Sequence, residues 1–253
     1  IDVDVEGMKI ATIKAAPVFG AQVATVDSSR AMEMPGVIQV VQLDDAVAVV
    51  ADGYWQAKKG LDAITVEWTD SGNEKIDSQA IFAQFQRDIE SKESAGSDVD
   101  VGDTKATLDD ADLVIQRQYR VPYLAHACME PMNAVARVAN GRCELWTGTQ
   151  DPLRFRHALV DALEIDYDNV TVTNHTMGGG FGRRSRPDTA IQAALIAREV
   201  GVPIKLIWSR EEDIRHDHYR PAVASNFRAT LGPDGMPLAW ENRFVEKHEP
   251  VEA

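Results

Sequence analysis

The sequence predicts an α+β fold, because runs typical of strands and runs typical of amphipathic helices are interspersed along its 253 residues. Residues 9–14 and 21–26 alternate in the manner of strands with one buried face. Residues 78–91 instead carry apolar side chains at helical spacing, from Ile81 to Ile89. Both kinds of pattern recur further along the chain, so we expect sheets and helices together.

Residues 1–68 are predicted to form a compact α+β unit. Ser28 and the Pro35-Gly36 pair give start and stop signals for its first, short helix. The predicted strands are 9–14, 21–26, 37–43, 46–50 and 65–68, and the predicted helices are 28–34 and 53–64.

Residues 69–110 are predicted to be a linker or long surface crossing that contains one helix. Ser78 is a suitable cap for a helix over residues 78–91. Residues 94–103 are polar and lack a helical period, as linkers do.

Residues 111–253 are predicted to form a second structured region. Asp151 and Pro152 are good start signals for one helix, and Gly201 ends another. Residues 231–236 have the composition of a hairpin turn. The predicted strands are 113–121, 134–138, 143–147, 170–173, 204–208, 224–230 and 237–245, and the predicted helices are 151–164 and 187–200.

Charge and composition exclude several classes of function. The net charge of −14 argues against a nucleic-acid partner, because phosphate contacts need a basic face. No stretch is apolar enough for a membrane span. Cys128 and Cys143 are too few for an iron–sulfur cluster, which takes about four ligands, and we interpret them as ordinary thiols. The chain opens at Ile1 and ends at Ala253 beside strand-like runs, so we expect a piece of a longer protein.

The most informative stretch is Met177-Gly-Gly-Gly-Phe-Gly-Arg-Arg184, between a predicted strand and a predicted helix. Glycines let a ligand approach the main chain, and exposed amides there can bind oxygen or sulfur atoms. The dinucleotide motif G-x-G-x-x-G fails because Arg183 stands at the last glycine position. The phosphate-loop motif fails because the required Lys-Ser/Thr pair is missing. From the residues alone, a ligand-binding loop and a tight structural turn both stay open.

The order of several motifs resembles the xanthine dehydrogenase and aldehyde oxidase family of molybdenum hydroxylases. Residues 177–182 resemble its glycine loop, and Thr149-Gln-Asp-Pro152 resembles its Thr-Gln-x-Pro segment. Residues 123–133, 201–206 and 209–213 resemble further family segments, and residues 1–68 resemble its hammerhead-like domain. The fold implied is a hammerhead-like α/β domain (1–68), a crossing segment (69–110) and part of the first molybdenum-cofactor-binding domain (111–253).

Within that family, Arg183-Arg184-Ser185 departs from the Gly-Lys-Glu of the xanthine enzymes. It is more similar to the bacterial isoquinoline 1-oxidoreductase type, β subunit. The substrate-facing Glu of the xanthine enzymes would fall at Ser185, which argues against a purine substrate.

The resemblance implies an oxidoreductase subunit that holds a molybdenum–pterin cofactor and hydroxylates an N-heterocycle or aldehyde with oxygen from water. It implies iron–sulfur clusters on a separate small subunit, and leaves open whether the pterin carries a cytosine dinucleotide. The cofactor-binding residues it implies are Gln150, Gly179, Gly180, Phe181, Gly182, Arg183 and Arg184.

No catalytic residue and no protein metal ligand is assigned within this chain. The family's general-base Glu is expected beyond Ala253, in the remainder of the same subunit. We therefore expect the 253-residue chain alone to be inactive and to bind cofactor weakly or not at all. The intact enzyme is expected in a bacterium, in either the periplasm or the cytoplasm.

Other residue groups are given structural interpretations. His126, Cys128 and Glu130 alternate, so a strand would put them on one face, but we favour structural roles over a zinc site. His216-Asp217-His218 is expected at a solvated helix end or loop. The five tryptophans are expected in the core, and Arg154, Arg156 and His157 are candidates for a phosphate-facing or a merely solvated face.

Two rival functions follow from these interpretations. In the first, the chain is a subunit-docking or assembly module whose glycine loop is purely structural. In the second, it is a nucleotide-binding domain, which the two failed phosphate motifs disfavour.

Overall fold

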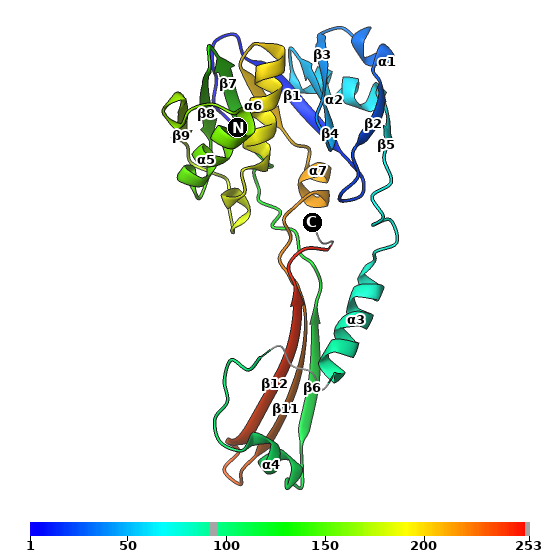
Figure 1. Ribbon diagram of the computed structural model, residues 1–253, viewed down its shortest axis with the longest axis vertical. Coiled ribbons are helices and arrows are strands. Elements are labelled where there is room, and N and C mark those ends of the chain that lie inside the picture. Colours follow the sequence, from blue (N-terminus) through cyan, green and yellow to red (C-terminus); the bar gives the residue numbers. More distant parts are fainter. Residues whose placement is uncertain (92–95, 251–253) are drawn as a thin grey trace. The chain divides into compact units, whose positions relative to one another are not determined.

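The computed structural model describes residues 1–91 and 96–250, and these form two compact units (Figure 1). Unit 1 contains residues 1–74 and 125–218. Unit 2 contains the described residues of 75–124 and 219–252. The predicted α+β class is confirmed, since strands and helices occur in both units.

Unit 1 is built on a seven-stranded mixed sheet. Its strand order is β3-β4-β1-β10-β7-β8-β9, in which β1–β10 and β8–β9 are the parallel pairs. A separate ribbon pairs β2 with β5. The strands are β1 (Lys9–Ala15), β2 (Val23–Asp27), β3 (Val37–Gln42), β4 (Ala46–Ala51), β5 (Thr65–Trp68), β7 (Asn133–Ala139), β8 (Arg142–Thr147), β9 (Val170–Asn174) and β10 (Ile204–Ile207).

Helices cover both faces of this sheet, so β4 is buried throughout. Ala46, Ala48 and Val50 belong to the core that includes α6, whereas Val47 and Val49 pack under α2. Burial on both faces explains why the sequence of β4 is an unbroken apolar run. The helices are α1 (Ser29–Met32), α2 (Tyr54–Ala63), α5 (Pro152–Leu163), α6 (Asp188–Val200) and α7 (Arg210–Arg215), with 3₁₀ turns η1 (Tyr167–Asn169) and η2 (Arg183–Ser185).

Unit 2 is a three-stranded antiparallel sheet with a helix on one face. The strand order is β12-β11-β6, and α3 buries Phe85 and Ile89 against Ala222 and Ala224 of β11. Figure 1 shows α3 beside this sheet. Its elements are α3 (Ser78–Glu90), α4 (Thr104–Asp109), β6 (Ile115–Val121), β11 (Ala222–Leu231) and β12 (Pro237–Lys247).

The predicted elements are confirmed with small shifts of their ends, including the hairpin around residues 231–236. Asp151 caps α5 by accepting from the amide of Arg154, and Gly201 ends α6 in the left-handed region. Helices α4 and α7 were not predicted, because each is only six residues long. Residues 92–95, part of the predicted polar linker, lie outside the described residues.

The units are not the predicted segments 1–68, 69–110 and 111–253. Strand β1 pairs in parallel with β10, so residues 1–68 share one sheet with residues 125–218. Periodicity along the chain predicts strands but not their partners, which are far apart in sequence. As domains of a longer protein, the three segments stay a prediction.

Two of the five tryptophans are not in the core. Trp55 is 73% exposed and Trp240 is 58% exposed, whereas Trp208 is 3% exposed. The prediction of core packing is therefore wrong for Trp55, which lies on the exposed side of α2, and for Trp240, which lies on the exposed side of β12. Both cysteines are free and buried, as predicted. Among the described residues, no helix has both the length and the apolar character needed to cross a bilayer.

Candidate cofactor-binding loop

The glycine loop, residues 177–182, connects β9 to η2 and α6. Three of its residues have positive φ: Gly179 at 104°, Phe181 at 53° and Gly182 at 100°. Positive φ is unusual for a phenylalanine, and such strained residues cluster at ligand sites and switches. The Phe181 side chain is 73% exposed, so core packing does not explain this conformation.

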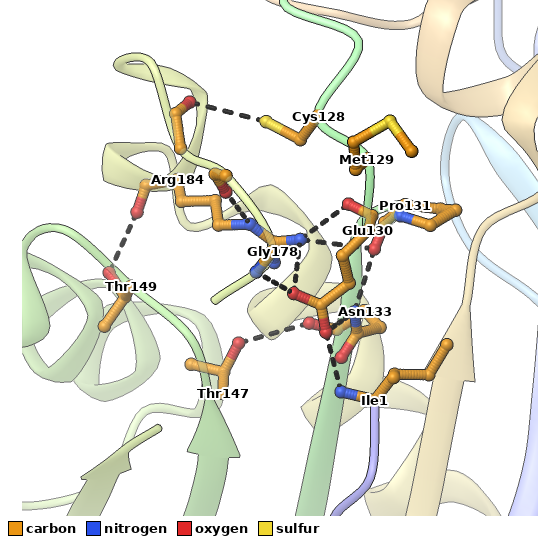
Figure 2. A network of polar contacts seen from close by, with 12 residues as sticks. Ile1, Cys128, Met129, Glu130, Pro131, Asn133, Thr147, Thr149, Gly178 and Arg184 are labelled. Carbon is orange, nitrogen blue, oxygen red and sulfur yellow. Dashed lines mark hydrogen bonds and ion pairs between the residues drawn. The ribbon is translucent and has the colours of Figure 1, made fainter. Parts of the chain in front are cut away.

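Glu130 holds the beginning of the loop in place through hydrogen bonds to Gly178 (Figure 2). Its Oε2 accepts from the Gly178 amide at 2.8 Å, and its own amide donates to the Gly178 carbonyl at 3.1 Å. The Asn133 side chain and the amino group of Ile1 also donate to Oε1. Glu130 is therefore a structural anchor of the loop.

Arg184 completes this network from behind the loop and is 1% exposed (Figure 2). Its Nε donates to the Gly179 carbonyl at 2.8 Å. Its Nη2 donates to the Glu130 carbonyl at 2.7 Å and lies 3.1 Å from the Glu130 carboxylate. Burial acts to raise the pKa of Glu130, but the hydrogen bonds it accepts and the charge of Arg184 outweigh burial and lower the pKa to about 2.

Arg183 is equally buried, on a second network. Its two terminal nitrogens donate to the Asp188 carboxylate at 2.9 and 2.6 Å, and its Nε lies 2.8 Å from Asp217 Oδ1. Burial acts to lower the pKa of Arg183, yet the bonds and charges of Asp188 and Asp217 raise it. The family resemblance implied that Arg183 and Arg184 are cofactor-binding residues. In the structure both guanidinium groups are buried, because Asp188 and Asp217 pair with Arg183 and Glu130 pairs with Arg184.

Gln150 holds the end of the loop. Its side-chain Oε1 accepts from the Gly182 amide at 3.0 Å, and its main-chain amide donates to the Arg184 carbonyl at 3.0 Å. Gln150 is exposed, and its side-chain Nε2 has no acceptor among the described residues. Gln150 therefore lies next to the loop, and its Nε2 donor has no partner among the described residues.

Two of the loop glycines lie close to other side chains of the protein. A Cβ on Gly178 would lie 2.5 Å from the Cβ of Glu130, and a Cβ on Gly180 would lie 2.7 Å from Gln150 Oε1. The surroundings of Gly182 are open, since a Cβ there would meet only His126 Nε2, at 3.7 Å. The Glu130 side chain therefore excludes a Cβ at position 178, whereas at position 182 the positive φ favours glycine and the space beside it is open.

The loop nevertheless leaves a row of main-chain donors. The amides of Gly179, Gly180 and Phe181 have no acceptor within residues 1–91 and 96–250, although Gly180 is buried. Successive amides of this kind bind oxygen or sulfur atoms of an anionic group. With Gln150 Nε2, they form a donor-rich cradle that suits the acceptor atoms of a molybdenum–pterin cofactor without help from an arginine.

Several other candidate groups are resolved by the structure. His126, Cys128 and Glu130 do not lie on a strand, since this segment is irregular and Ala127 has a φ of 46°. The strand assumed for them is therefore wrong. No group of three or more His, Cys, Asp or Glu among the described residues could hold a metal ion.

Residues 216–218 follow the end of α7, which is one of the two expected alternatives, but Asp217 is buried rather than solvated. His216 caps α7, and Asp217 is 3% exposed because it faces Arg183. Arg156 on α5 donates to the Tyr167 carbonyl and lies 3.6 Å from the centre of its ring. The guanidinium of Arg156 therefore binds within the protein, between α5 and η1.

Comparison with known proteins decides the family. A family model described as "Molybdopterin cofactor-binding domain" matches residues 86–251, which include the whole glycine loop. The chain belongs to the molybdopterin cofactor-binding domain family. This confirms the resemblance that the motifs suggested.

Individual relatives agree with that assignment. Isoquinoline 1-oxidoreductase subunit beta of Brevundimonas diminuta is 30% identical over 91% of this chain and 31% of the relative. A protein of Gluconacetobacter polyoxogenes named membrane-bound aldehyde dehydrogenase [pyrroloquinoline-quinone] is 31% identical over 88% of this chain and 30% of the relative. The chain thus spans about a third of the length of these curated relatives.

The fold is similar to that of a solved oxidoreductase. Quinoline 2-oxidoreductase from Pseudomonas putida 86 matches with a TM-score of 0.73 at 19% identity, over 96% of this chain and 36% of the solved chain. At this identity the likeness concerns the fold.

Two residues of this molybdopterin-binding domain could not be found from the sequence. They are Glu130 and Asp217, whose carboxylates pair with Arg184 and Arg183. From the sequence, Glu130 was expected to have a structural role rather than to bind zinc, and Asp217 was expected at a solvated helix end or loop, but neither was expected to pair with an arginine next to the glycine loop. A buried arginine needs a buried carboxylate as its partner. The Arg183-Arg184 pair was therefore the one sequence signal that such carboxylates exist. It did not say which carboxylates would serve.

Proposed function

We propose that this chain is part of the cofactor-binding subunit of a molybdenum-dependent oxidoreductase that hydroxylates an N-heterocycle or an aldehyde. The observation that carries the proposal is the row of amides at Gly179, Gly180 and Phe181, which have no acceptor among the described residues, within a molybdopterin cofactor-binding domain. The names of the relatives support both substrate classes, since they include an isoquinoline oxidoreductase and an aldehyde dehydrogenase.

Each loop residue has a distinct part in this proposal. The amides of Gly179, Gly180 and Phe181 and the Nε2 of Gln150 donate to acceptor atoms of the cofactor. Gly182 keeps the adjoining space open. Arg183 and Arg184 hold the loop in place rather than touching the cofactor.

When bound, the cofactor supplies the two-electron chemistry of hydroxylation, and the protein binds and orients it. The residues described here perform only that binding. The general-base Glu, the iron–sulfur partner subunit and the rest of the same subunit belong to the proposed whole enzyme. The 253-residue chain alone is therefore expected to have no hydroxylase activity.

The proposal is tested by metal and cofactor analysis of the full-length subunit, purified with its co-expressed partner. We expect about one molybdenum and one pterin per chain, as cofactor enzymes hold them stoichiometrically. Pyrroloquinoline quinone should be assayed in parallel, because one relative carries it in its name. A folded full-length subunit that contains the quinone and no molybdenum would overturn the proposal.

The docking-module alternative makes a different prediction. Gln150→Glu would keep the oxygen that accepts from the Gly182 amide and would replace the Nε2 donor beside the loop with a second acceptor. If the loop binds the cofactor, this variant loses molybdenum and still co-purifies with its partner. If the loop is only structural, molybdenum is retained in the folded variant.

A further inference from the structure

His126 is a side chain beside the glycine loop to which the proposed function gives no part. Its Nδ1 lies 3.1 and 3.0 Å from the two carboxylate oxygens of Asp217, and its main-chain amide donates to the same carboxylate. The imidazole is 11% exposed and the carboxylate is 1% exposed. The ring is therefore held in one orientation by a buried partner.

Asp217 is itself fixed from its other side. Arg183 Nε lies 2.8 Å from its Oδ1, and Arg183 is bound in turn by Asp188. A carboxylate in this position accepts, so the neutral imidazole of His126 carries its proton on Nδ1. Its Nε2 is consequently left with a lone pair that can accept a hydrogen bond.

That Nε2 faces the glycine loop. Among the described residues other than Gly182 and its two chain neighbours, it is the one heavy atom within 4 Å of the position that a Cβ on Gly182 would occupy, at 3.7 Å. Within the same residues, Nε2 has no hydrogen-bond partner of its own. His216 provides the contrast, because its nitrogens lie 2.7 Å from Glu212 and 2.9 Å from the Ala16 carbonyl.

We propose that His126 is a ligand-contacting residue of the glycine-loop site, whose Nε2 accepts a hydrogen bond from an N–H or O–H group of the bound cofactor. This proposal rests on the proposed function. The loop amides can only donate, so they select acceptor atoms, and His126 adds an acceptor next to them. Together they recognise a group that presents acceptor and donor atoms side by side. Asp217 and Arg183 are positioning residues.

Chemical footprinting of the full-length subunit tests this without a mutation. Diethyl pyrocarbonate acylates an unprotonated imidazole nitrogen that a reagent can reach, and mass spectrometry locates the label. We expect His126 to be labelled in the cofactor-free subunit and protected in the molybdenum-loaded one. His248, which is 74% exposed, should be labelled equally in both.

Two substitutions make the test independent of the reagent. His126→Gln keeps an acceptor oxygen at the end of the side chain, whereas His126→Leu removes it. We expect the dissociation constant of the cofactor to rise about tenfold in the Leu variant and by less than about twofold in the Gln variant, because one hydrogen bond to the cofactor is lost only in the first. His248→Leu is the control and should retain full occupancy.

The outcomes separate this proposal from the proposed function. If the wild-type subunit contains molybdenum but His126 is labelled equally with and without it, the role of His126 is overturned and cofactor binding stands. If the folded wild-type subunit contains no molybdenum, both are overturned. If the Leu variant does not fold, the footprinting result on the wild-type subunit decides by itself whether His126 contacts the cofactor.

Discussion

Unit 1 keeps the charges behind its glycine loop buried and paired, whereas unit 2 carries ion pairs and aromatic rings on its surface. Arg184 and its partner Glu130 are 1% and 15% exposed, whereas Arg228 and its partner Glu241 are 35% and 34% exposed. The N···O distance is 3.1 Å in both pairs. The two pairs have the same distance but differ in burial. Removing one partner should therefore lower the free energy of unfolding strongly only in unit 1, where the other charge stays buried.

The aromatic residues differ in the same way. In unit 2, Tyr119, Phe227 and Trp240 form a chain of edge-to-face ring contacts along one sheet face, and Tyr119 and Trp240 are each 58% exposed. In unit 1, Trp208 is buried and its indole donates to Gln192 at 3.1 Å. The stability of unit 1 therefore depends on satisfied buried polar groups, and the following experiments test that difference.

The largest expected effect comes from the two matched arginines. Arg184→Met should lower the free energy of unfolding by about 3–5 kcal/mol, because the Glu130 carboxylate loses its buried arginine partner and the Gly179 and Glu130 carbonyls lose a donor. Arg228→Met should cost about 0–1 kcal/mol. Urea denaturation of both variants measures the two losses, and equal losses would contradict the comparison.

The Glu130 carboxyl predicts a pH dependence. Its pKa is about 2 in the folded protein against an ordinary value of 4.5, so its ionised form contributes its full stability above pH 4.5. That contribution, about 1–3 kcal/mol once solvent screening is included, is lost as the pH falls from 4.5 toward 2. The difference in unfolding free energy between wild type and Glu130→Gln should therefore shrink over this range. A difference that stays constant down to a pH of about 3 would show that the charge of Glu130 is not what stabilises the loop.

A matched pair of glycines tests the packing of the loop. Gly178→Ala should cost about 1–3 kcal/mol, since its Cβ would lie 2.5 Å from the Cβ of Glu130 and the main chain must shift. Gly96→Ala in unit 2 should cost almost nothing, because no described atom lies within 4 Å of the added Cβ. Thermal unfolding of each variant gives the comparison. A neutral Gly178→Ala would mean that Glu130 does not pack against the loop.

The smallest expected effect is one that the two units should share. Asp151 caps α5 in unit 1 and Asp103 caps α4 in unit 2, each by accepting a main-chain amide hydrogen bond at 3.0 Å. Substitution of either by Ala should cost about 1 kcal/mol locally, because a cap acts on its own helix end. Hydrogen exchange of the first turn of each helix measures this. A much larger loss for Asp151 would mean that capping, too, depends on the buried network.

Sequence reasoning predicted most elements, because periodicity and capping signals are local. The all-apolar β4, the cap at Asp151 and the stop at Gly201 are examples. It did not predict α4 and α7, which are too short to show a helical period. It also did not predict the pairing of β1 with β10, whose residues are about 200 positions apart in the chain.

For the site, the sequence by itself determined the glycine loop, its neighbour Gln150 and the family to which the loop belongs. Only the tertiary structure decided that Arg183 and Arg184 turn inward and that Glu130 and Asp217 receive them. The physical reason is that a buried guanidinium must find carboxylates and carbonyls in three dimensions, and those that pair with Arg184 lie as far as 54 positions away. The same folding aims His126 Nε2 at Gly182, which no spacing in the sequence could have shown.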